Sequence, residues 1–397
     1  MNPRVFVYAS LSALALLGFV GAQNAQPGRA NRDVETLERF GPRVAGTPTL
    51  ERAANYLVGE YKKVGYEAHI QAFTYSRFED AGSTLTVLGT KLNGSALYAS
   101  SMEAVQGRLI AVPNSGNPED YKGLKARGTV VLVRRGNITF EAKLRAAEAA
   151  GALGVVLVNS VPSTFQTRIY QPSSLPMIVV SGADGEPLFA RATKENLTVR
   201  LTSKVERVSV AGKNVVAYLS GVTQPSLILG GHMDSVPGSP GANDNASGTA
   251  ATLEIARRMM GTPLSKQTWF VSFDGEEDGL RGSRGFLDAQ PDAFKTGLKG
   301  MLNFDMVGVN NSLAVGGSAK LVATVQGLNS GVGKFEDFNG SDHGSFIADG
   351  IPAVFFWRGY EPNYHQPGDV KTEAALIDET VELGLRTAQK WLETPGN

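Results

Sequence analysis

SLILGGHMDSVPGSPGANDNASGTAATLEIARRMM, residues 226–260, is the stretch that decides the fold. Its first part, SLILGGH, is a short apolar run of the kind that forms a buried strand. Its last part, SGTAATLEIARRMM, has apolar residues at helical spacing, with Ser247 in the N-cap position. A loop rich in Gly, Pro and Asn separates the two. The stretch therefore predicts a strand, a loop and a helix in succession.

The same alternation continues to the end of the chain. We expect further strands in VVAYLS (215–220), QTWFVSF (267–273), GLKGMLNFDMVG (297–308) and IPAVFFWRG (351–359). An amphipathic helix, TEAALIDETVELGLRTAQKWLE (372–393), closes the chain. Strands that alternate with helices favour an α/β fold with a mostly parallel central sheet, flanked by helices on both faces.

The first half of the chain has a different texture. Residues 34–73 predict two helices and a strand, with Gly65 at a helix C-cap. Between about residues 84 and 203, short β-rich runs such as GTVVLVRRG and LGVVLVN alternate with turns, and one helical segment, FEAKLRAAEAAGA, intervenes. We interpret residues 84–203 as a β-rich module inserted into an α/β domain formed by residues 23–83 and 204–397.

The N-terminus and the composition limit where the protein acts. Residues 1–22 are predicted to be a signal peptide, because Arg4 precedes an apolar run and Val20-Gly21-Ala22 forms a small-residue cleavage site. We therefore expect a secreted or periplasmic protein with no stable membrane anchor after cleavage. The 397 residues contain no cysteine, and 38 basic residues balance 38 acidic ones. A balanced charge excludes a basic field for nucleic acid.

Polar residues that bind metals follow the predicted strands. In open α/β sheets, ligands bind outside the carboxyl ends of the strands, so groups far apart in sequence converge there. The candidates on this edge are His232, Asp234, Asp244, Glu276, Glu277, Asp305, Tyr364 and His365.

The types of these side chains point to metal chemistry. Two histidines and three carboxylates, without a thiolate, suit zinc or a similar divalent ion. Five such ligands exceed what one catalytic zinc needs, and with one bridging carboxylate they suit two ions, about 3.5–4 Å apart in two-metal hydrolases. Asp234, two residues after His232, is placed to orient the imidazole through its other ring nitrogen.

Five short motifs together resemble a known family. GGHMDSVPGSPGANDNASG, DGEEDGLRGS, NFDMVG, SDHGSF and YHQPGD occur in the order found in the M28 family of dizinc exopeptidases, and RVAGTP near residue 43 is similar to the family's opening. The inserted block resembles a protease-associated (PA) domain. The resemblance implies an aminopeptidase with a phosphorylase/hydrolase-like fold, two Zn²⁺ ions and peptide substrates that carry a free N-terminus.

The resemblance also implies a role for each candidate residue. His232 and Asp305 would bind one ion, Glu277 and His365 the other, and Asp244 both. Glu276 would be the general base, and Tyr364 would help to stabilise the oxyanion. The loop SDHGSF matches a loop near the substrate site in some members, which adds Asp342 and His343 as candidate pocket residues.

Several alternatives stay open at this stage. The adjacent glutamates, taken alone, are typical of an exposed acidic turn. Relatives with similar motifs include carboxypeptidases or dipeptidases, single-zinc glutaminyl cyclases and receptor-like proteins that have lost the ligands. A carboxypeptidase needs basic residues to hold the substrate carboxylate, and the site motifs offer only Arg281, Arg284 and Arg358. The PA block could gate the site, contact substrate or a partner protein, or aid dimerisation.

Overall fold

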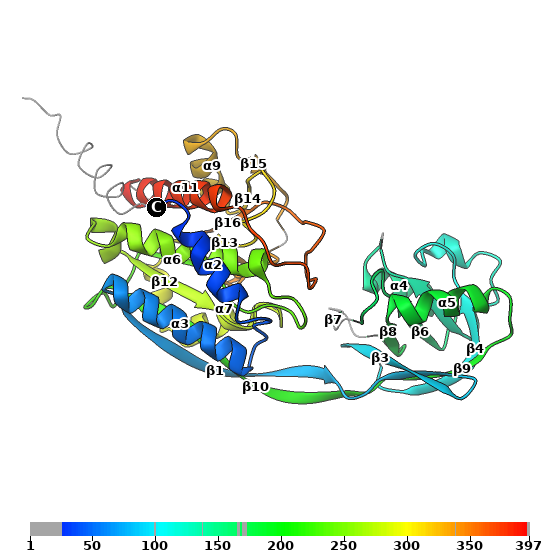
Figure 1. Ribbon diagram of the computed structural model, residues 1–397. Helices are drawn as coiled ribbons and strands as arrows, with labels where there is room; N and C mark the ends of the chain where they lie inside the picture. The colour runs from blue at the N-terminus through cyan, green and yellow to red at the C-terminus, as the bar shows by residue number, and fades with distance from the viewer. Residues whose placement is uncertain are drawn as a thin grey trace, which may run out of the picture. The chain divides into compact units, whose positions relative to one another are not determined.

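The computed structural model describes residues 26–394, except 99–100, 137, 165–166, 169–172 and 338. The predicted signal peptide, residues 1–22, lies outside the described residues. The chain forms two compact units (Figure 1). The first unit is built from two stretches of the chain, one up to Tyr75 and one from Val210 onward, and the second unit is Ser76–Ser209. Across the described residues, no helix is both long and apolar enough to span a membrane.

The first unit contains a mixed sheet. In spatial order its strands are β1 (Glu67–Asp80), β10 (Val205–Tyr218), β12 (Thr268–Phe273), β11 (Leu227–His232), β13 (Gly300–Phe304), β16 (Ala353–Trp357), β14 (Ala314–Gly317) and β15 (Gly333–Lys334). The four strands β12, β11, β13 and β16 are parallel to their neighbours in this group, whereas β10 and β14 pair antiparallel with it. The carboxyl ends of the four central strands therefore meet at one edge.

Helices pack on both faces of this sheet (Figure 1). The larger core lies beneath α2 (Arg29–Glu38), α3 (Pro48–Val64), α6 (Gly248–Met259), α9 (Ala319–Leu328) and α11 (Ala374–Glu393). The smaller core lies beneath α7 (Arg281–Asp288), α8 (Asp292–Gly297) and α10 (His343–Ala348). Within β11, Leu227 and Leu229 face the larger core and Ile228 the smaller one. The first residues of the strand, Leu227–Leu229, are apolar because both faces of the strand are buried.

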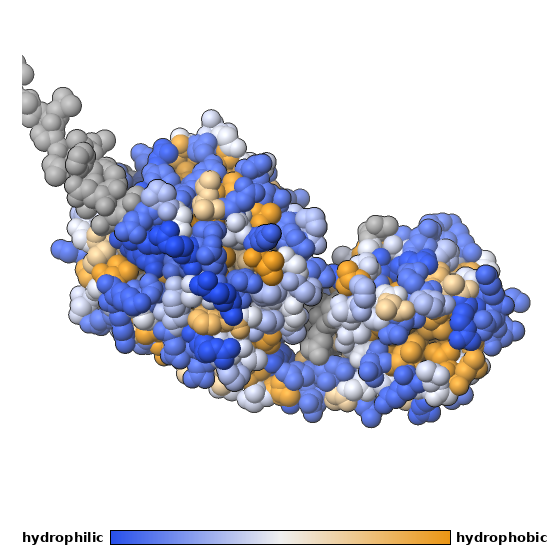
Figure 2. Space-filling view, in the orientation of Figure 1, coloured by the Kyte–Doolittle hydropathy of each residue, from blue (hydrophilic) through white to orange (hydrophobic). Residues whose placement is uncertain are grey.

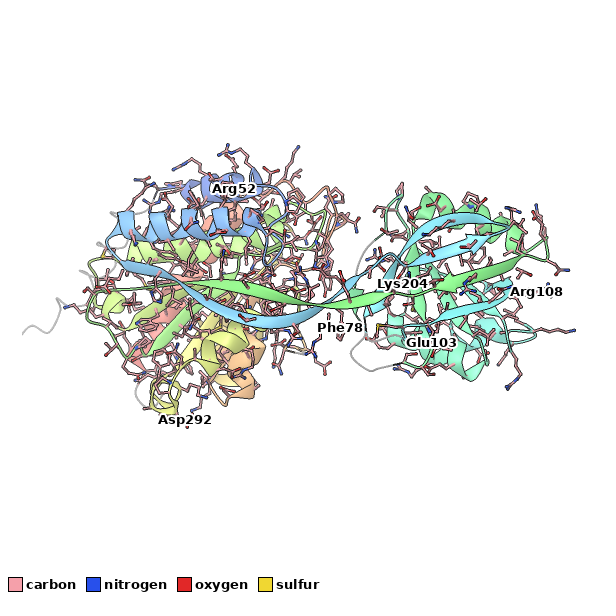
Figure 3. All side chains as sticks on the ribbon, turned by 90° about the horizontal axis from the view of Figure 1, so that it is seen from below. Arg52, Phe78, Glu103, Arg108, Lys204 and Asp292 are labelled. Carbon is pink, nitrogen blue, oxygen red and sulfur yellow. The ribbon has the colours of Figure 1, made fainter. Side chains whose placement is uncertain are left out.

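Local sequence signals set the bounds of α3. Thr47 caps its first turn by accepting a hydrogen bond from the N–H of Leu50. The helix ends at Gly65, whose φ of +109° suits a residue without a Cβ, as the sequence predicted. Figure 3 shows Arg52 on this helix, where its side chain is exposed. The opening segment thus forms two helices, α2 and α3, followed by β1.

The second unit is a β-barrel with two helices. Its strands form a closed ring in the order β2 (Thr84–Val87), β9 (Thr198–Thr202), β4 (Ala104–Ala111), β5 (Val130–Arg134), β6 (Gly154–Val158), β8 (Met177–Val180) and β3 (Thr90–Tyr98), which pairs again with β2. The short β7 (Thr167–Arg168) pairs with β3. The α-helices of this unit are α4 (Phe140–Ala149) and α5 (Gly182–Ala192). The predicted runs form strands, whereas β3, β7, α5 and the closure of the ring were not predicted.

Polar residues cover much of both units. On the face that Figure 2 shows, hydrophilic residues occupy most of the surface of the first unit, with apolar residues scattered between them. The exposed large apolar side chains of the described residues are Phe78, Leu88, Met102, Tyr360 and Val370. Phe78 lies on β1, which runs beside β10 (Figure 3).

Candidate metal centre

The carboxyl edge of the central sheet carries the candidate residues. His232 is the last residue of β11, Asp305 directly follows β13, and the loop after β12 holds Glu276 and Glu277. His365 lies in the loop between β16 and α11, with a φ of +56°. The parallel register of the central strands is what brings these positions together.

Asp244 reaches the same edge from an irregular turn. The segment η2 (Ala242–Ser247) precedes α6, and Asp244 and Asn245 have non-helical backbone angles within it. The Asn245 side chain donates to the carbonyl of Phe304 and accepts from the N–H groups of Met306 and Gly248, which ties the turn to the end of β13. Ser247 does not cap α6 with its side chain, because its hydroxyl donates to the Asn243 carbonyl instead.

Asp244 connects two clusters of metal-ligating side chains. Nε2 of His232 lies 3.3 Å from Oδ1 of Asp244 and 3.5 Å from Oδ1 of Asp305. Nε2 of His365 lies 3.1 Å from Oδ2 of Asp244 and 3.2 Å from Oε2 of Glu277. Each oxygen of Asp244 therefore faces a different histidine. Two groups of potential ligands share this carboxylate: His232 with Asp244 and Asp305, and Asp244 with Glu277 and His365.

The glutamates are close but not equivalent. Glu277 is the one within ion-pair distance of His365, whereas Glu276 gathers with His232 and Glu277 in a third possible group. The carboxylate of Asp234 accepts hydrogen bonds from the N–H of Glu276 at 3.3 Å and from the N–H of Glu277 at 3.2 Å. This buried aspartate thus holds the backbone of both glutamates in place.

Two residues that sequence reasoning did not single out support the cluster. Ser341 donates to Oδ2 of Asp305 at 2.7 Å. The carboxylate of Asp369 accepts the N–H groups of Asn243 and Asp244 at 2.7 and 3.0 Å. Both lie within motifs that the sequence analysis quoted, SDHGSF and YHQPGD. Their polar, hydrogen-bonding character was the available signal, but their partners are far away in the chain.

The pKa values of the cluster are shifted because its carboxylates are crowded together and buried. Burial raises the pKa of Glu277 to about 7 and that of Glu276 well above its ordinary range. Burial by itself lowers the pKa of His365, but Glu277 and Asp244 outweigh it and raise the value to about 11. Likewise, Asp305 and Glu276 outweigh burial and raise the pKa of His232. These shifts arise because several carboxylates and two histidines lie close together in a buried site.

Divalent cations fit this arrangement of side chains. Oε1 of Glu277 and Oδ1 of Asp305 are buried and find no hydrogen-bond partner among the described residues. Buried carboxylate oxygens without partners are costly unless a cation meets them. Nitrogen and carboxylate ligands without sulfur suit zinc and similar divalent ions.

The remaining candidates lie at different depths. The ring of Tyr364 stacks on that of His365, with centroids 3.8 Å apart, and both residues are partly exposed. Asp342 and His343 are fully enclosed, so neither offers surface to a bound peptide in this conformation. His343 stacks on Phe355, and its Nε2 lies 2.7 Å from Asp337. Burial raises the pKa of Asp342 to about 7.

Comparisons with known proteins show what the chain is similar to. Residues 214–382 match peptidase family M28, and residues 105–188 match the PA domain. Aminopeptidase YwaD of Bacillus subtilis (strain 168) is 30% identical over 363 residues, which cover 84% of this chain and 77% of the relative. The structure of BSAP, a zinc aminopeptidase from Bacillus subtilis, has a TM-score of 0.75 at 25% identity and covers 91% of this chain and 94% of its own. An aminopeptidase from Aneurinibacillus sp. strain AM-1 has a TM-score of 0.69 at 28% identity, with coverage of 95% and 96%.

Proposed function

The chain belongs to peptidase family M28, and we propose that it removes N-terminal residues from peptides with two zinc ions bound at the cluster around Asp244. The chain is a metallo-exopeptidase that carries a PA domain. The observation that supports two ions is the position of Asp244, whose two carboxylate oxygens face His232 and His365 separately. One ion would be held by His232, Asp305 and Asp244, and the other by His365, Glu277 and Asp244.

Bound zinc would act as a Lewis acid and lower the pKa of water toward about 7. Glu276 is the general base: its carboxylate takes the proton of the attacking water and later returns it to the leaving amine. The N–H of Glu276 donates to the carboxylate of Asp234, which also accepts the N–H of Glu277. These bonds fix the backbone of both glutamates. The two adjacent glutamates thus have separate roles, one as base and one as ligand.

Tyr364 supplies a hydrogen-bond donor for the oxyanion that forms at the substrate carbonyl. A tyrosine hydroxyl keeps its proton at neutral pH, and burial raises the pKa of this one further above the ordinary range. The stack on His365 holds the ring beside the cluster. A donor held in place before the reaction stabilises developing negative charge without reorganisation.

The proposed substrate class follows from the comparisons with relatives. The relatives that this chain resembles are aminopeptidases, which favours peptides with a free N-terminus as its substrates. We further propose that the protein acts outside the cytoplasm, on the strength of the predicted signal peptide.

A panel of peptides tests this function. A peptide with a free N-terminus should lose its first residue, and the same peptide acetylated at the N-terminus should stay intact. A chelator should abolish the cleavage, and added zinc should restore it. Equal cleavage of the free and acetylated peptides would overturn the aminopeptidase assignment, and full activity in excess chelator would overturn the role of a metal.

A further inference from the structure

The RVAGTP motif places a buried arginine beside the cluster, and no carboxylate among the described residues pairs with it. Arg43 is fully buried. Its guanidinium donates to the carbonyls of Met233 at 2.7 Å, Gly241 at 2.8 Å and Leu37 at 3.4 Å, and also to that of Pro240. Every acceptor in this set is a neutral main-chain oxygen.

A second buried arginine of the same unit offers a contrast. Arg257 donates to the carboxylates of Asp33 and Glu60, as buried arginines commonly do. Arg43 instead holds the loop that leads from His232 to Asp244. Its charge lies near Asp234 and Asp369, and this proximity partly offsets the burial that lowers its pKa to about 10.

The loop wraps the guanidinium closely. Gly241 has a φ of +64°, and a Cβ placed there would lie 3.0 Å from an Arg43 nitrogen and 2.3 Å from the carbonyl oxygen of Asp244. Ser235 adds to the same contact, because its hydroxyl accepts the N–H of Arg43 at 3.0 Å and donates to the Ser239 carbonyl at 2.9 Å. The loop therefore has little freedom to move away from Arg43.

Asp369 holds the other side of the same backbone. It is 2% exposed, and its carboxylate accepts the N–H groups of Asn243 and Asp244. Its own carbonyl accepts the N–H of Ala242 at 3.1 Å. Arg43 thus engages carbonyls at positions 240 and 241, and Asp369 engages N–H groups at positions 242–244.

We propose that Arg43 and Asp369 are positioning residues that together fix the backbone of Asp244, so that its two carboxylate oxygens meet both metal ions at once. This inference rests on the proposed function. A bridging carboxylate must satisfy two ligand sets whose nitrogens already lie 3.3 and 3.1 Å away. A small rotation of the turn would improve one contact and lose the other, and supporting hydrogen bonds prevent this.

Zinc affinity of the purified full-length protein tests the proposal. Arg43→Met keeps the length of the side chain but removes its donors. Asp369→Asn keeps the shape but turns an N–H₂ group toward two N–H donors. Competition with a chelator should give zinc binding about 10–100-fold weaker in each variant, as is usual when support of a metal ligand is lost. The double variant should be only slightly weaker than the single ones, because both residues act on one segment.

Arg257→Met is the matched control, since it also removes a buried arginine from this unit. It should lower the melting temperature and leave the zinc affinity of the folded protein unchanged. At saturating zinc, kcat of Asp369→Asn should recover toward wild type with little change in KM, which a general loss of folding would not produce. If Arg43→Met does not fold, the zinc affinities of Arg43→Lys and Asp369→Asn are measured in its place.

The outcomes separate the two proposals. Wild-type zinc affinity in Arg43→Met and Asp369→Asn overturns the positioning role and leaves the proposed function intact. Failure of the wild-type protein to bind zinc overturns the proposed function itself.

Discussion

Oδ1 of Asp234 lies 3.4 Å from Nδ1 of His232, at the end of β11. The same ring nitrogen is 3.2 Å from the carbonyl oxygen of Asp234, so one residue offers it two acceptors. An acceptor at Nδ1 leaves Nε2 free to bind a metal. Because the carboxylate also accepts the N–H groups of Glu276 and Glu277, Asp234 links a proposed ligand of each ion to the proposed base.

Asp234→Asn should therefore weaken metal binding without removing any proposed ligand. We expect zinc affinity to fall by about 10–100-fold, because the amide turns a donor toward groups that are themselves donors. Titration of the metal-free protein with zinc measures this. A variant that binds zinc as tightly as the wild type would show that Asp234 does not orient His232.

Glu276→Gln should separate catalysis from metal binding. The amide is isosteric but cannot accept a proton, so we expect kcat to fall by about 10²–10⁴-fold while both ions stay bound. Steady-state kinetics and elemental analysis of the same sample give the two readouts. Asp292→Asn, at the exposed start of α8 (Figure 3), is a charge-matched control that should behave as wild type. Near-normal turnover in Glu276→Gln would exclude this residue as the base.

Asp244→Ala should affect both ions rather than one. Its carboxylate oxygens lie within 3.3 Å of His232 and 3.1 Å of His365, so truncation removes a ligand from each proposed site. We expect elemental analysis to find well below two zinc ions per chain. Asp305→Ala is the comparison, because it touches only the His232 side and should leave one ion bound. A full complement of zinc in Asp244→Ala would contradict the bridging role.

Gly248→Ala tests how closely α6 approaches the sheet. A Cβ at this position would lie 1.9 Å from the carbonyl oxygen of Phe304, the residue before Asp305. The strand must shift to accommodate it, so we expect the free energy of unfolding to fall by about 1–3 kcal/mol. Zinc binding should also become weaker. Gly59→Ala on α3, where a Cβ meets no atom within 4 Å, should instead be neutral or stabilising by about 0.5–1 kcal/mol. Equal melting temperatures for the two variants would contradict this account.

Lys143 in the PA unit predicts a pH dependence of stability. The side chain is enclosed, and burial lowers its pKa to about 8, whereas lysine in an unfolded chain has a pKa of about 10.4. Between these values the unfolded chain binds more protons than the folded one, so this contribution to stability rises with pH. The neutral amine still has two N–H groups for the carbonyls of Ser115 and Gly136.

Thermal unfolding of wild type and Lys143→Met between pH 7.5 and 10 measures this effect. The wild type should gain stability relative to the variant as pH rises. Lys122→Met, which removes an exposed lysine from the same unit, should show no such trend. A constant difference between wild type and Lys143→Met across the range would contradict a depressed lysine pKa.

Many elements of the first unit could be predicted because their signals are local, whereas β14, α9, β15 and α10 were not predicted. The apolar run of β11, the helical spacing of α6 and Gly65 at the end of α3 each follow from a few neighbouring residues. The PA unit was less predictable. Seven strands close into a ring because β2 pairs with β3, and that pairing joins a predicted run to a segment, TKLNGSALY, whose polar composition hides its strand character.

The sequence by itself determined the candidate residues of the site and the chemistry that their types allow. The histidines, the carboxylates and the order of their motifs are readable because metal ligands are restricted to a few side chains that follow strands in an α/β pattern. Only the tertiary structure decided that each oxygen of Asp244 faces a different histidine, that Glu277 rather than Glu276 lies beside His365, and that Asp342 and His343 are enclosed. The contacts of Arg43 and Asp369 with the loop before Asp244 also became visible only there, since their partners are main-chain groups. A hydrogen bond to a main-chain group does not depend on which residue carries that group. The sequence therefore cannot predict such a bond, and only the folded structure shows it.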